Sequence, residues 1–272
     1  LGLAITFGLM GVINMAHGEF IMIGAYATYV VQNIWKQIFP EAMFDWYFPA
    51  AILVSFLFTA LLGVLLERVI ICRLYGRALD SLLVTWGISL VLQQLVRSVF
   101  GPANVSVSCP SFLDKNIHIF GMFSMSCKRL FIFGLAVVCC ALIGFLMYRT
   151  RQGRNIRAAM QNRPMAASLG VNTAACDMMT FAVGSGFAGV AGCAITFLGS
   201  IGPTVGQSYI VDSFMTVVVG GVGRIVGCIT GSAVIGVGGP VFEFFTSASL
   251  GKVLIFIVVV IILQFRPKGI FS

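Results

Sequence analysis

The stretch that decides the fold runs from Pro49 to Ile71 and reads PAAILVSFLFTALLGVLLERVII. No charged residue occurs in it before Glu67 and Arg68, which lie close to its end. An α-helix needs about 20 predominantly apolar residues to cross the hydrocarbon core of a bilayer. The stretch therefore predicts a membrane-spanning helix whose charged end lies near one membrane surface.

Similar apolar stretches recur along the whole chain. Four more are uninterrupted: Ser81–Phe100, Leu130–Tyr148, Met178–Leu198 and Val253–Phe265. Two others are interrupted: Leu1–Trp35 at Asn14–Glu19, and Ile210–Phe245 at Arg224. We count each interrupted stretch as two crossings. The predicted fold is all-α, a polytopic integral membrane protein of about eight transmembrane helices, some of them broken or short.

The composition excludes most other classes of protein. Of the 272 residues, 59% are hydrophobic and only 10% are charged, and the mean hydropathy is +1.02. An ordinary soluble domain is about 45–50% apolar and about 25% charged. This excludes a soluble globular protein, a disordered chain and a secreted disulfide scaffold. We expect one transmembrane domain over residues 1–272, truncated at its start because Leu1 already lies inside an apolar run.

The formal net charge of +8 is explained by where the basic residues lie. Arg73 and Arg77 follow one predicted span, arginines cluster between residues 149 and 163, and Arg266 and Lys268 follow the last span. Cytoplasmic loops of membrane proteins collect lysine and arginine. We therefore predict a cytoplasmic loop at 149–177, an outer loop at 101–129, and no nucleic-acid partner.

The positions of the cysteines do not indicate a set of structural disulfides. Cys109 and Cys127 both lie in the outer loop, where they can form a disulfide if that loop faces an oxidising compartment and otherwise remain thiols. Cys139 and Cys193 lie in predicted spans, where free cysteine behaves as a small hydrophobic residue. The sequence has no Cys-x-x-Cys pair, so we expect neither a metal site nor a redox centre.

Small residues recur at every fourth position in two spans. One series is Ser185, Gly189 and Cys193, and the other is Gly223, Gly227 and Gly231. Small residues at this spacing let two helix backbones approach closely in lipid. The series predict tight packing within this chain, or alternatively a contact with a second permease subunit.

The interruption in the first apolar region holds candidate functional residues. Asn14, His17 and Glu19 lie there, and ionisable groups within a membrane segment are candidates for a substrate path. The alternative, which we favour at this point, is a structural turn facing the cytoplasm, with Asn14 as a cap and Glu19 at the start of a helix.

A second polar group occurs in the span Ser81–Phe100. Thr85, Ser89 and Gln93 are spaced by four and therefore share one helix face. Hydroxyl and amide groups supply both hydrogen-bond donors and acceptors, as a path for a small neutral solute requires. They also suit hydrogen bonding between helices, which is the alternative interpretation.

The cytoplasmic loop contains the elements of a short capped helix. Pro164 is favourable in the first turn of a helix, Gly170 can close it in the left-handed conformation, and Asn172 can cap the next helix. Such a helix can transmit motion from a soluble partner to the spans. The alternative is a positively charged anchor without a partner.

Five segments together resemble the branched-chain-amino-acid type of ATP-binding-cassette (ABC) importer permeases. They are Gly8–Glu19 with its Asn-x-Ala-His-Gly run, Gly153–Ala158, Met165–Thr173, Val219–Gly227 and Arg266–Gly269. Within that family the chain is most similar to urea importer permeases, through Ile13–Gln32, Phe44–Pro49 and Leu83–Arg97.

The resemblance implies a permease subunit that moves urea or short amides across the inner membrane by alternating access. It implies a second permease subunit, two ATPase subunits that bind ATP and magnesium, and a periplasmic or extracellular substrate-binding protein. No cofactor and no enzymatic activity are expected in this chain, which lacks a Gly-x-x-x-x-Gly-Lys-[Ser/Thr] phosphate loop. The residues that the resemblance assigns to ATPase coupling are Arg154, Arg157, Pro164, Ala166, Ala167 and Gly170.

Three alternatives differ from this reading. The first is a branched-chain amino acid importer permease. The second is a self-sufficient channel or secondary carrier for small solutes. The third is an intramembrane enzyme, which the sequence disfavours because His17 and His118 have no neighbouring histidine or nucleophile.

Overall fold

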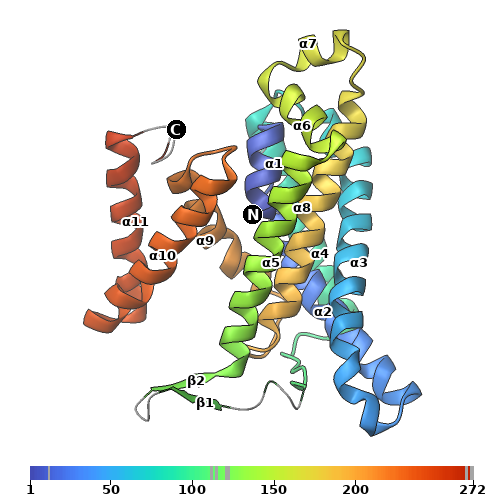
Figure 1. Cartoon of the computed structure of the whole chain (residues 1–272), viewed down its shortest axis with the longest axis vertical. Coiled ribbons are helices and arrows are strands. Elements are labelled where there is room, and N and C mark those ends of the chain that lie inside the picture. The colour runs from blue at the N-terminus through green and yellow to red at the C-terminus, as the bar shows by residue number, and fades with distance from the viewer. Residues whose placement is uncertain (12, 111–112, 114–115, 120–122, 267–268, 270–272) are drawn as a thin grey trace.

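A computed structural model describes residues 1–11, 13–110, 113, 116–119, 123–266 and 269. It is a bundle of helices that run alongside one another (Figure 1). In chain order the elements are α1 (Gly2–Met10), α2 (His17–Ile38), η1 (Glu41–Trp46), α3 (Tyr47–Val69), η2 (Ile71–Arg73), α4 (Ala78–Phe100), β1 (Asn116–Ile119), β2 (Phe123–Ser126), α5 (Cys127–Arg149), α6 (Arg151–Gln161), α7 (Arg163–Ser168), α8 (Thr173–Ile195), α9 (Val205–Gly220), α10 (Ile225–Phe245) and α11 (Ala248–Phe265).

The structure confirms the all-α polytopic membrane fold. Among the described residues, six helices are long and apolar enough to cross a membrane: α3, α4, α5, α8, α10 and α11. Both interrupted regions form two helices each, and Arg224 lies in the connection between α9 and α10. The predicted turn at that arginine is thus confirmed.

A short β-hairpin in the outer loop was not predicted. Its strands β1 and β2 are antiparallel, with Asn116 paired to Ser126 and Ile119 paired to Phe123. The alternation of apolar and polar residues in these four-residue strands was too brief to be separated from an irregular loop.

The two loops named in the sequence lie at opposite ends of the bundle. Helices α6 and α7 extend beyond one end, where the C-terminal end also lies, whereas η1 and the hairpin lie at the other (Figure 1). The arginines that follow α5 and α11 therefore share one end, as the positive-inside prediction requires. Lys268, which belongs to the same prediction, lies outside the described residues.

Helices α2, α3 and α8 form the centre of the bundle through very close backbone approach. A Cβ atom added to Gly24 of α2 would overlap the carbonyl group of Gly189 in α8, and one added to Gly63 of α3 would overlap the Ser185 hydroxyl. Between α2 and α3, Thr28 Oγ1 lies 3.1 Å from Ser55 Oγ. Close backbone contact and buried hydroxyl groups are the usual means of helix association in lipid.

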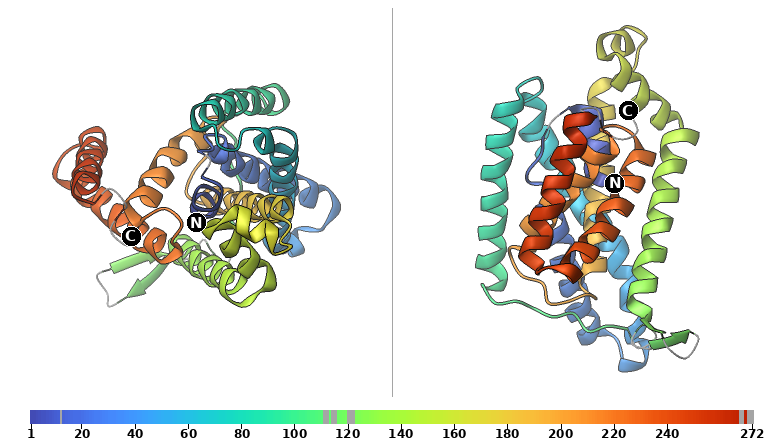
Figure 2. Two further views of the ribbon diagram at one scale, coloured as in Figure 1. Left: turned by 90° about the horizontal axis from the view of Figure 1, so that it is seen from above. Right: turned by 90° about the vertical axis from the view of Figure 1, so that its left-hand side faces the viewer.

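Both small-residue series pack within this chain. Ser185 and Gly189 face α3 and α2, and Gly227 and Gly231 of α10 lie against Gly220 of α9. Helix α10 continues into α11, and these two helices form a hairpin beside α9 (Figure 2). The structure thus supports packing within the chain, rather than a contact with a second subunit, for both series.

The sequence left open a disulfide between the two cysteines of the predicted outer loop. No disulfide joins Cys109 to Cys127 in the described part of the chain. The structure therefore agrees with the alternative in which these two cysteines are not joined to each other.

Candidate functional site

The break between α1 and α2 is built from local backbone chemistry. Gly11 ends α1 in the left-handed conformation, with φ of 62°. The Asn14 side chain then accepts a hydrogen bond from the Ala16 N–H at 3.0 Å, which turns the chain into α2. Asn14 is therefore a turn residue ahead of the helix, and Glu19 lies in the first turn of α2, as expected.

The prediction of a turn facing the cytoplasm is wrong. Asn14, His17 and Glu19 are all buried, with exposed fractions of 3%, 4% and 1%. The turn lies against α4, because the Met15 N–H donates to Thr85 Oγ1 at 3.1 Å. The reason is that Gly11 ends α1 within the bundle, so that α2 begins there rather than at the end of the bundle.

The polar face of α4 meets Glu19. Ser89 Oγ donates to Glu19 Oε1 at 2.7 Å, and Gln93 Nε2 donates to the same oxygen at 2.8 Å. Ser89 lies at the middle of α4, so the carboxylate sits at mid-depth along that helix. The structure therefore brings two distant segments together here, with Asn14 and Glu19 on one side and Thr85, Ser89 and Gln93 on the other. His17 does not join them: its ring lies 5.9 Å from that of Phe20 and faces Gly2 of α1.

This polar cluster retains unused hydrogen-bonding capacity. Among the described residues, Asn14 Nδ2, His17 Nδ1 and Glu19 Oε2 are buried without a partner. A buried polar atom without a partner costs free energy and calls for an explanation. These atoms include a donor, Asn14 Nδ2, and an acceptor, Glu19 Oε2, and a polar ligand with groups of both kinds would satisfy them.

The second candidate region is helix α7, in the loop predicted to be cytoplasmic, and the short helix forms as predicted. Asn162 accepts from the Met165 N–H at 3.1 Å and caps the helix, and Pro164 lies in its first turn. Gly170 ends it with φ of 83°. Asn172 then caps α8 by accepting from the Ala175 N–H at 3.0 Å. These caps fix α7 as a separate short helix across the end of the bundle.

The predicted coupling residues do not share one surface. Arg154, Pro164, Ala167 and Gly170 are exposed, whereas Ala166 is buried against the bundle. The Arg157 guanidinium lies 5.0 Å from the centroid of the Tyr148 ring, so this side chain turns back toward α5.

Two apolar residues of this loop were missed by the sequence reasoning. Met165 is 59% exposed and Leu169 is 77% exposed at the tip formed by α7. Their signal was present in the sequence: Met165 lies within, and Leu169 directly after, a helix of only six residues, which is too short to bury both side chains. Exposed apolar side chains beyond the end of a membrane bundle are typical of a protein contact.

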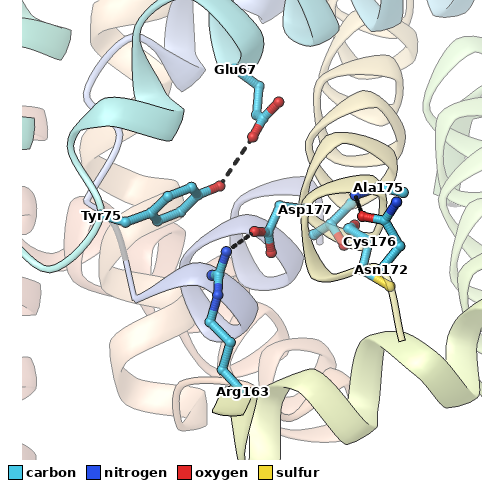
Figure 3. Close-up of polar contacts among 8 residues, drawn as sticks. Glu67, Tyr75, Arg163, Asn172, Ala175, Cys176 and Asp177 are labelled. Atoms are coloured by element: carbon cyan, nitrogen blue, oxygen red, sulfur yellow. Dashed lines mark hydrogen bonds and ion pairs between the residues drawn. The ribbon is translucent and has the colours of Figure 1, made fainter. Parts of the chain in front are cut away.

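Arg163, the first residue of α7, joins a polar cluster at the end of the bundle (Figure 3). Its guanidinium pairs with the Asp177 carboxylate of α8 and lies 4.7 Å from the centroid of the Tyr75 ring. The Tyr75 hydroxyl donates to Glu67 Oε1 at 3.3 Å. Burial, with the nearby Asp177 and Glu67 carboxylates, raises the pKa of the Tyr75 phenol, so it remains a donor at neutral pH.

Residues 1–263 match the family model described as the branched-chain amino acid transport system / permease component. The chain belongs to this family. No solved structure matches it significantly.

Curated relatives cover almost the entire chain. The high-affinity branched-chain amino acid transport system permease protein BraD of Pseudomonas aeruginosa is 29% identical over 99% of this chain and 89% of its own length. LivH of Escherichia coli K12 gives the same figures, 29%, 99% and 89%. The probable LivH of Methanocaldococcus jannaschii is 25% identical over 99% of this chain and 86% of its own. All three relatives are named for branched-chain amino acid transport.

Proposed function

We propose that this chain is the membrane-spanning permease subunit of an ABC importer for branched-chain amino acids. The observation that carries the proposal is the family match over residues 1–263, with relatives named for branched-chain amino acid transport along nearly the whole chain. Urea, which the closest sequence likeness suggested, has no comparable support. The chain acts as a transport subunit of a cell inner membrane and not as an enzyme.

Energy comes from two separate ATPase subunits that dock at α7. The support for this is the projecting position of the helix and its two exposed apolar residues, Met165 and Leu169. Exposed Arg154 lies in the same loop and supplies a positive charge for the contact. ATP and magnesium bind to those partners, and a second permease subunit and a substrate-binding protein complete the importer.

The substrate passes the cluster around Glu19. An amino acid is a zwitterion, which needs an acceptor for its ammonium group and donors for its carboxylate. Glu19 Oε2 is an acceptor without a partner, and Asn14 Nδ2 is a donor without a partner, both among the described residues. Thr85, Ser89 and Gln93 add hydroxyl and amide groups along the same face of α4.

Uptake by the reconstituted complex tests the proposal directly. The permease is combined with its second permease subunit, ATPases and binding protein in vesicles, and uptake of labelled leucine is measured with and without ATP. We expect ATP-dependent uptake that isoleucine and valine compete and urea does not. Competition by urea but not by isoleucine would restore the urea reading, and uptake without ATP would indicate a channel or secondary carrier.

A further inference from the structure

Arg163 connects the proposed docking helix to two parts of the bundle at once. Through its ion pair it holds Asp177, which lies near the start of α8. The flat face of its guanidinium lies over the Tyr75 ring, with Cζ 4.7 Å from the ring centroid. An arginine can do both because its guanidinium is planar and bears donors at its edge. A movement of α7 therefore acts on α8 and on Tyr75 through the Arg163 side chain.

Tyr75 belongs to the corner between α3 and α4. It follows η2 and precedes Ala78, where α4 begins. Its hydroxyl group is held by Glu67 at the end of α3, which is buried with 4% exposure. The corner is thus anchored on one side to α3 and is contacted on the other by Arg163, as Figure 3 shows.

The two helices contacted in this way differ in how they can respond. Helix α8 is held against α2 and α3 by glycine contacts, where Gly189 and Gly24 leave no space for a side chain between the backbones. The half of α4 nearer Tyr75 is held by hydrogen bonds along one face, to Glu19 and to the turn at Met15, whereas apolar packing of Val96 and Phe100 against α2 holds its far end. Its opposite face is exposed, with Leu83 at 63% and Val91 at 64%. Hydrogen bonds can exchange partners during a shift, whereas interlocked backbones cannot.

We propose that Arg163 is a positioning residue that transmits motion of α7 through Tyr75 to α4, and that α4 is the helix that moves at the substrate path. The bond to Asp177 keeps the guanidinium of Arg163 against the Tyr75 ring as α7 moves, and we call this route from α7 through Arg163 and Tyr75 to α4 the lever. When the corner at Tyr75 is displaced, α4 shifts and its Ser89 and Gln93 leave Glu19, which frees the carboxylate for substrate. The proposal rests on the proposed function, because docked ATPases supply the motion of α7.

The test measures α4 directly in the reconstituted importer. Spin labels are attached at Val91→Cys on α4 and Leu198→Cys after α8, both exposed positions, after the eight native cysteines are replaced and ATP-driven uptake is verified. We expect ATP to change the distance between the labels. In Tyr75→Leu, which keeps the Arg163–Asp177 pair, we expect the change to be lost and leucine uptake to fall about ten-fold while ATP hydrolysis continues.

Two further substitutions and a control sharpen the test. Arg163→Lys keeps the charge facing Asp177 but loses the planar contact with Tyr75, so we expect an intermediate loss of the distance change. Tyr75→Phe keeps the ring and loses the bond to Glu67, so we expect a smaller loss than in Tyr75→Leu. Arg151→Ala removes the same charge from an exposed position in the same loop and should leave both uptake and the distance change intact.

The results separate this proposal from the one on which it rests. If the unmodified importer transports leucine and Tyr75→Leu retains both the distance change and uptake, the lever is wrong and the proposed function stands. If the unmodified importer shows no ATP-driven uptake, the proposed function is wrong and the lever falls with it. A distance change lost equally in Arg151→Ala would also overturn the lever, because general loss of charge would then be the cause.

Discussion

Helices α3 and α4 are both 23 residues long, yet they join the bundle by opposite means. Helix α3 meets α2 and α8 through small side chains that bring backbones together, as at Gly63 and Ser185. Helix α4 meets the start of α2 through polar side chains that reach across to Glu19, and its far end packs on α2 through an apolar cluster around Val96. Because lipid removes the hydrophobic drive between helices, packing and hydrogen bonding are the two available means, and this chain uses them in different places.

The difference predicts different mechanical properties. A contact made by interlocked backbones loses many dispersion contacts when its helices separate, so it resists movement. A contact made by a few hydrogen bonds can be exchanged for bonds to a substrate or to water. The α2–α3–α8 centre therefore serves as a frame, and the contact between α4 and Glu19 serves as the adjustable part. Four substitutions test this comparison.

Gly63→Leu should have the largest effect. Its side chain would overlap Ser185 and approach Phe181, so α3 and α8 cannot remain in contact. Overpacking of this kind typically costs about 1–3 kcal/mol and more where the backbone cannot move. We expect little folded protein in the membrane, measured as yield and as thermal unfolding in detergent. Gly87→Leu on α4, where the added Cβ would meet open space, is the matched control; equal loss in both variants would remove the distinction.

Gln93→Ala tests the adjustable contact. It removes a donor 2.8 Å from Glu19 Oε1 and leaves the carboxylate with Ser89. A lost hydrogen bond to a buried charged group costs about 1.5–3 kcal/mol. We expect folded but less stable protein with leucine uptake reduced about ten-fold, because the amide that Gln93 offers to the substrate along α4 is lost. Gln94→Ala, which changes the neighbouring exposed amide, should transport normally. Unchanged uptake in Gln93→Ala would exclude this face of α4 from the path.

Gly170→Val tests the docking helix without touching either kind of contact. Gly170 has φ of 83° and open space around it, so valine would be strained by its backbone rather than by a clash. The left-handed conformation costs about 1–2 kcal/mol for a residue with a side chain. We expect normal membrane insertion and reduced uptake, with weaker binding of the ATPase subunits in a pull-down. Ser168→Ala, in the same exposed helix, should retain both; normal ATPase binding by Gly170→Val would argue against docking at α7.

The sequence predicted the membrane-spanning helices and helix α7 better than it predicted the candidate site. Spans such as Pro49–Ile71 were recognisable because apolar length alone specifies a crossing. Helix α7 was recognisable because proline and glycine mark its two ends and Asn172 caps the helix that follows it, all by local backbone chemistry. Both kinds of signal depend on residues that are close together in the sequence, and neither requires knowledge of the tertiary fold.

The site could be predicted only in parts. The spacing of Thr85, Ser89 and Gln93 revealed a shared face, but nothing local indicated that it would meet Glu19, which is 70 residues from Ser89. The turn at Asn14 was misplaced because its depth depends on how far α1 extends into the bundle. Arg163 was read as one positive charge among several, because its partners Asp177 and Tyr75 are apparent only once α7 folds back on the bundle.

Thr28→Val should have the smallest effect, and it tests the frame most sharply. The substitution keeps the shape of the side chain and removes the hydroxyl that lies 3.1 Å from Ser55 Oγ between α2 and α3. Hydrogen bonds between membrane helices average about 0.6 kcal/mol, and Ser55 keeps its bond to the Gly24 carbonyl at 3.0 Å. We expect only a slight fall in thermal stability and normal uptake, because backbone packing at Gly24 and Gly189 holds these helices. If Thr28→Val were as damaging as Gly63→Leu, the frame would depend on hydrogen bonds as α4 does, and the proposed division between a fixed centre and a moving helix would be lost.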